Sequence, residues 1–202
     1  MSGDDDLKAV APHLLCQLYA NLVGELRLYP ASAPERLAAE GLRALLTGNP
    51  LSHTMNTSVD YVEINGVRAS EFTLNAYMAG YHGVPVCFVS GDAALCDSAR
   101  RMIPDIATVP VNKRDGNSAT SLHPALAVKR IEETLRAQLE SGAYRTCTVP
   151  MPPKFEIIIR YKEHRAAYRC SFYPGVEQVD EKTLRFTCVD YMDAMCLFQF
   201  VL

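Results

Sequence analysis

Apolar runs that predict strands alternate with helical patterns over residues 50–149. Residues 61–67 alternate apolar and polar side chains around Asn65-Gly66, which predicts a strand or hairpin ending in a tight turn. Further strands are predicted over residues 84–90 and 106–111, and helices over residues 93–102 with Asp92 as N-cap, over 124–139 and after Ser70 as N-cap. The near-continuous apolar run at 84–90 is typical of a strand buried in a parallel sheet. This order predicts an α/β unit with parallel pairing, which would bind a ligand at the carboxyl ends of its strands.

The prolines around residue 150 predict a boundary. Val149-Pro150-Met151-Pro152-Pro153 favours a stiff, extended linker, because each proline fixes its own φ and restricts the residue before it. Beyond this linker, strands are predicted over residues 155–161, 167–172 and 183–188, and an apolar helix over residues 191–202. The charged stretch 162–165, which contains His164, is interpreted as a hairpin loop.

The first 49 residues have a different pattern. Leucines recur there at three- and four-residue steps, which predicts helices, the second over residues 33–46, and no strand. The chain is therefore expected to have a helical segment (1–49), an α/β part (50–149) and a smaller α+β C-terminal part (150–202). The predicted fold class is mixed α/β, with a largely parallel sheet flanked by helices.

Composition narrows the class of protein without naming a function. The chain has 202 residues, 49% hydrophobic and 21% charged, with a formal net charge of −3, which is typical of a globular protein. No apolar run approaches the ~20 residues of a membrane-spanning helix, and the acidic start lacks a secretory signal pattern, so we expect a cytoplasmic protein. A pI of about 6.0 gives no basic footprint for nucleic acid. The seven cysteines are odd in number and contain no C-x-x-C pair, so buried thiols are favoured over disulfides or a zinc ribbon.

Two residues could carry chemistry. His53 lies in a short polar loop and could exchange protons near neutral pH, although a loop histidine without a catalytic role is the more common case. Glu71 opens a predicted helix and could bind a metal ion, but any helix start favours a carboxylate by about 0.3–1 kcal/mol. Neither residue alone specifies a site.

The residues around this pair form an ordered set of motifs. They are Ser52-His53-Thr54-Met55, Ile64-Asn65-Gly66, the stretch from Glu71 to Tyr81, the stretch from Val84 to Asp92, Ser121-Leu122-His123-Pro124 and Tyr173-Pro174-Gly175. Together they resemble the zinc-dependent D-aminopeptidases first associated with dipeptide-transport operons, over about residues 50–202.

The resemblance implies a metallo-aminopeptidase that removes N-terminal residues, preferably D-amino acids, from short peptides, uses zinc and forms a homo-oligomer. By that resemblance, His53 matches the catalytic histidine and Glu71 matches a zinc ligand. Asn75 lies one helical turn beyond Glu71 on the same face and would support the metal site. A purely structural helix asparagine is an equally good interpretation.

The family's earlier metal-binding elements are not matched. Members carry an Asp-x-Glu-Gly strand and further histidines before the Ser-His-Thr-Met element, whereas Gly80-Tyr81-His82 follows that element here and is not counted as a ligand. One glutamate cannot hold a catalytic zinc, which typically needs three protein ligands, so zinc is not expected to be retained by this chain alone. A truncated or wrongly joined gene, a divergent inactive member, and ligands donated by another chain are the three explanations. The alternative function is therefore a catalytically inactive scaffold or assembly protein. An unrelated small-molecule binding module is a third interpretation.

Overall fold

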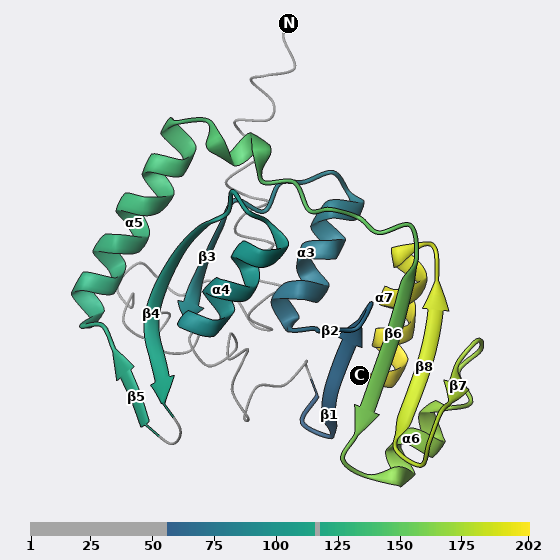
Figure 1. Cartoon of the computed structure of the whole chain (residues 1–202). Coiled ribbons are helices and arrows are strands. Elements are labelled where there is room, and N and C mark those ends of the chain that lie inside the picture. Colours follow the sequence, from purple (N-terminus) through teal and green to yellow (C-terminus); the bar gives the residue numbers. More distant parts are fainter. Residues whose placement is uncertain (1–55, 116–117) are drawn as a thin grey trace, which may run out of the picture.

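The computed structural model describes residues 56–115 and 118–202, which form two sheets with helices packed against them (Figure 1). This arrangement confirms the mixed α/β class. The helices predicted over residues 1–49 lie outside the described residues. None of the helices within the described ranges is both long and apolar enough to cross a membrane.

The larger sheet has five strands in the order β2-β1-β6-β8-β7, and every pair of neighbouring strands in it is antiparallel. Its strands are β1 (Val59–Ile64), β2 (Val67–Arg68), β6 (Phe155–Tyr161), β7 (Glu177–Gln178) and β8 (Thr183–Cys188). The predicted hairpin is confirmed, because Asn65 (φ 52°) and Gly66 (φ 76°) both adopt the left-handed conformation of a two-residue turn. The Asn65 side chain fixes this turn to β6 by accepting from the Glu156 N–H at 2.7 Å and donating to the Lys154 carbonyl at 3.0 Å.

The smaller sheet has the order β3-β4-β5, with β3 (Phe88–Asp92), β4 (Ala107–Asp115) and β5 (Ser118–Ser121). Helix α4 (Ala93–Met102) joins β3 to β4 in parallel, as predicted. The prediction of largely parallel pairing is wrong, since β3–β4 is the only parallel pair within the described residues. Short hairpins account for the antiparallel pairs of consecutive strands, β1–β2, β4–β5 and β7–β8. The antiparallel pairs β1–β6 and β6–β8 join strands that are farther apart in the chain.

The remaining helices are α3 (Glu71–Tyr81), α5 (Pro124–Glu140), the 3₁₀ turn η1 (Ala143–Thr146), α6 (His164–Cys170) and α7 (Tyr191–Val201). Three of them confirm the predictions for residues after Ser70, 124–139 and 191–202. Helix α6 overturns the strand predicted over 167–172 and the loop predicted at His164. Its buried residues Ala167 and Cys170 are three apart, so they lie on one helical face.

Helix α3 lies between two hydrophobic cores. Leu74 packs in the core between the five-stranded sheet and α7, whereas Phe72 and Ala76 pack in the core of β3 and α4. In the first core the Tyr191 hydroxyl donates to the Leu74 carbonyl at 2.8 Å, which joins α7 to α3. Burial on both sides fixes α3 in place, and with it the residue at its start.

The linker predicted near residue 150 is an extended segment between η1 and β6. The predicted boundary at this segment would place β1 and β6 in different parts of the chain. These two strands are neighbours in the five-stranded sheet, paired from Val59 with Tyr161 to Ile64 with Ile157.

Candidate functional site

Glu71 is the first residue of α3 and is buried, with 9% of its surface exposed. A capping box holds this end of the helix. The Ser70 hydroxyl accepts from the Thr73 N–H at 3.2 Å, and the Thr73 hydroxyl accepts from the Ser70 N–H at 3.1 Å. The preceding Ala69 N–H donates to the Val62 carbonyl of β1 at 2.9 Å. Strand β1, its hairpin and the capping box therefore fix the backbone of Glu71 at the positive end of the helix dipole.

Asn75 lies one turn beyond Glu71 and bonds to the backbone there. Its side-chain amide donates to the Glu71 main-chain carbonyl at 2.8 Å. This bond fits the structural interpretation of Asn75, and a role beside a metal ion stays a prediction. His53 lies outside the described residues, so its position relative to Glu71 also stays a prediction.

The described residues contain no group of side chains that could hold a metal ion. Nowhere in residues 56–115 and 118–202 do three or more His, Cys, Asp or Glu side chains lie close enough to hold a metal ion. The three described histidines lie in separate places: His82 is the C-cap of α3, His123 the N-cap of α5, and His164 the first residue of α6. The expected set of zinc ligands is thus not formed by Glu71 and its described neighbours.

A second group of polar side chains lies at the carboxyl ends of the parallel strands. Asp92 ends β3 and caps α4, since its Oδ1 accepts from the Leu95 N–H at 2.7 Å. This confirms the predicted N-cap. Asn112 of β4 is its register partner, and the buried Asn112 Oδ1 has no hydrogen-bond partner among the described residues. Sequence reasoning missed Asn112, although its place after the apolar run 106–111 was a usable signal.

The cysteines of the described residues are free thiols, as predicted. Five of them are buried, namely Cys87, Cys96, Cys147, Cys170 and Cys188, and Cys196 is exposed. Cys16 lies outside the described residues. Burial raises the pKa of the Cys87 and Cys147 thiols, which keeps them protonated and poorly nucleophilic at neutral pH.

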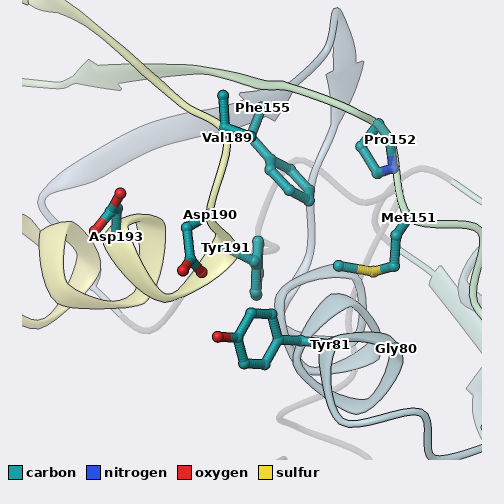
Figure 2. A pocket seen from close by; sticks show the side chains of 9 residues that line it. All are labelled: Gly80, Tyr81, Met151, Pro152, Phe155, Val189, Asp190, Tyr191 and Asp193. Carbon is teal, nitrogen blue, oxygen red and sulfur yellow. The ribbon is translucent and has the colours of Figure 1, made fainter.

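The hollow in the surface shown in Figure 2 lies away from Glu71. It is lined by Gly80 and Tyr81 at the opposite end of α3. Nine residues along the helix place Gly80 about 14 Å from Glu71, at about 1.5 Å per residue. This groove therefore lies at the other end of α3 from Glu71.

Comparison with known proteins agrees with the sequence motifs. A family model described as D-aminopeptidase matches residues 43–200. A D-aminopeptidase of Bacillus subtilis (strain 168) is 31% identical over 151 residues, which is 73% of this chain and 54% of that protein. The solved structure of the Zn-dependent D-aminopeptidase DppA from Bacillus subtilis, described as a self-compartmentalizing protease, matches with a TM-score of 0.63 and 26% identity.

The match to the solved structure covers 75% of this chain and 57% of that one, so the chain spans about half the length of these relatives. The family match, in contrast, covers most of the chain. The resemblance expected from the sequence is confirmed, and the chain belongs to the D-aminopeptidase family.

Proposed function

We propose that the chain acts as an aminopeptidase on short peptides that carry an N-terminal D-amino acid. The observation that carries this proposal is the placement of Glu71. The residue that matches the family's metal-binding glutamate is buried, and a capping box fixes it at the start of a helix held between two cores. Catalytic side chains need such fixed positions, because small displacements cost large factors in rate.

His53 is the second residue of the proposal. Because His53 matches the family's catalytic histidine, we propose that it transfers a proton during hydrolysis. Histidine suits this role because an imidazole ordinarily titrates near neutral pH. A catalytic zinc typically needs three protein ligands, and the described residues form no such group.

The same observation favours a second candidate, a catalytically inactive scaffold that keeps the family fold. Glu71 is then a helix-start carboxylate stabilised by the helix dipole, and the family fold serves assembly instead of hydrolysis. The two candidates differ in two measurable properties, bound zinc and turnover.

The test uses the whole purified chain dialysed against zinc. If it is a peptidase, it holds stoichiometric zinc and hydrolyses D-alanine p-nitroanilide faster than the L-isomer. Glu71→Gln and His53→Ala each lower the rate by about 100-fold or more, and Glu71→Gln also lowers the zinc content. Glu140→Gln, on the exposed face of α5, is the matched control and leaves both unchanged. No zinc together with no turnover, in a chain with a cooperative unfolding transition, contradicts the peptidase and supports the scaffold.

We also propose that the chain forms a homo-oligomer in the cytoplasm. The description of the Bacillus subtilis relative as self-compartmentalizing supports assembly, as do the strongly exposed side chains of Phe172 (71%) and Phe200 (72%). Light scattering coupled to size exclusion measures the subunit number, and a monomer contradicts the proposal.

A further inference from the structure

An open groove of about 710 Å³ lies where the end of α3, the extended segment before β6 and the start of α7 meet (Figure 2). Phe155 and Tyr191 form its floor. Each is 1% exposed, and their ring centroids are 4.9 Å apart. The volume falls in the range of about 300–1,000 Å³ typical of binding clefts, and the floor is rigid because both rings belong to the main core.

The rim of the groove is apolar and exposed. Tyr81, Met151 and Val189 are 42%, 37% and 75% exposed, and each comes from a different segment of the chain. Single exposed apolar residues are ordinary on a protein surface, but these three line one hollow (Figure 2). Aromatic and methionine side chains are enriched at binding surfaces.

Two carboxylates at the start of α7 line the same groove. Asp190 and Asp193 are both exposed, and Asp190 also caps the helix by accepting from the Met192 N–H at 2.8 Å. Among the described residues neither forms an ion pair. Five other acidic side chains, Asp60, Glu63, Glu156, Glu177 and Asp180, all pair with arginines of the five-stranded sheet. The groove therefore offers two negative charges beside an apolar rim, and no cation of residues 56–115 or 118–202 forms an ion pair with them.

We propose that this groove binds an arginine side chain presented by a segment of a partner protein. An arginine matches both halves of the groove. Its aliphatic stem packs on Met151 and Val189, as long basic side chains do on apolar surfaces. Its guanidinium stacks on the Tyr81 ring and donates to the Asp190 and Asp193 carboxylates. The helix dipole explains acidic residues at the start of α7, but it does not explain the apolar rim in front of them.

This binding site does not include Glu71, because it lies at the other end of α3. The peptide used as the probe distinguishes binding in the groove from peptidase activity. An N-acetylated tripeptide amide, Ac-Ala-Arg-Ala-NH₂, has no free N-terminus for an aminopeptidase to act on. The isosteric Ac-Ala-citrulline-Ala-NH₂ keeps the stem and the planar head but removes the positive charge.

The experiment titrates both peptides into the ¹⁵N-labelled full chain and follows backbone amide shifts. We expect saturable shifts at Gly80–Tyr81 and at residues 189–193, with the citrulline peptide about five- to tenfold weaker, as two partly exposed ion pairs predict. Raising the salt concentration weakens the arginine peptide more than the citrulline peptide.

The test variant is Asp190→Asn with Asp193→Asn. Asparagine keeps the helix cap, so the fold is retained, and the arginine peptide binds about five- to tenfold more weakly. The control variant, Glu140→Gln with Glu181→Gln, removes the same charge from exposed positions elsewhere and binds like the wild type. Three outcomes overturn the proposal: no shifts at the groove, equal affinity of the double variant, or concentration-dependent self-association through the same residues, which makes a second copy the occupant.

Discussion

The thiol of Cys96 shows how burial sets the chemistry of one residue. Its side chain is 0% exposed on the inner face of α4, and burial raises its pKa from 9.0 to about 11. At neutral pH it stays an uncharged thiol, so it is a poor nucleophile. Cys196, which is exposed, is the described thiol expected to react first with a thiol reagent.

This burial predicts a loss of stability at alkaline pH. In the unfolded chain the Cys96 thiol loses its proton near pH 9, whereas in the folded chain it keeps the proton to about pH 11. The unfolded state therefore binds fewer protons in this window, and the free energy of unfolding falls as pH rises. A difference of about two pKa units corresponds to roughly 2–3 kcal/mol.

Urea unfolding of the wild type and of Cys96→Ala between pH 8 and pH 11 measures this contribution. The wild type is expected to lose stability relative to the variant across that window. The tyrosines provide an internal control, because burial also raises the pKa of Tyr161 and Tyr191 in both proteins. Parallel pH curves for the two proteins contradict the prediction.

Local chemistry made several residues predictable. Ser70 and Asp92 cap their helices as predicted, because a short polar side chain before an apolar helical pattern can bond the free N–H groups within its own turn. The hydrogen bond from Asn75 to the Glu71 carbonyl was not predictable in the same way. The sequence is the same whether the Asn75 side chain is exposed, faces a metal ion or, as here, bonds to the backbone.

At the scale of elements, predictions succeeded where a pattern is local and failed where partners are distant. Helix α4 was predicted to the residue. Strand β3 begins at Phe88 instead of Val84, because Pro85 has no N–H and the Val86 N–H donates to the Cys147 carbonyl at 2.9 Å. Nothing in residues 84–90 specifies this contact with the segment before β6.

Helix α3 and the segment before β6 approach each other closely at Gly80. A Cβ at this position would lie 2.7 Å from the Met151 sulfur and 2.9 Å from the Val149 Cβ. Val149 is 7% exposed and has little room to move, whereas Met151 can turn outward. The glycine in the last turn of α3 thus has a packing reason.

Gly80→Ala is therefore expected to destabilise the protein by about 1–3 kcal/mol through overpacking, although alanine favours helix by about 1 kcal/mol. It is also expected to weaken binding of the arginine peptide, because it displaces Met151 from the groove rim. Urea unfolding and the peptide titration measure the two effects. Combining it with Met151→Ala relieves part of the strain. A gain of about 1 kcal/mol for Gly80→Ala alone, as helix propensity predicts, contradicts this account.

At the scale of the whole molecule, the pairing of strands is what the sequence left open. The strands β1, β6 and β8 were each predicted, but their order and antiparallel pairing were not. The alternation of side chains along a strand does not specify which strand pairs with it. The candidate site shows the same limit. The placement of Glu71 follows from local capping, but its relation to other ligands depends on contacts between distant parts of the chain.

The sheet order makes a prediction about the boundary near residue 150. A fragment of residues 150–202 would keep β6, β8 and α7 but lose β1 from one edge of β6. It would also lose α3, whose Tyr77 ring packs 5.3 Å from Phe155 and 5.5 Å from Tyr191. The fragment would then expose both an unpaired strand edge and the apolar face of α7.

We therefore expect the fragment 150–202 to lack the cooperative thermal transition and the dispersed amide signals that we expect of the full chain. Adding a separate peptide of residues 56–81, which supplies β1, β2 and α3, is expected to restore folding in part, because it returns the edge pairing and the Tyr191–Leu74 hydrogen bond. A scrambled peptide of the same composition is the control. Independent folding of the fragment would contradict this expectation and would establish the extended segment as a boundary between domains.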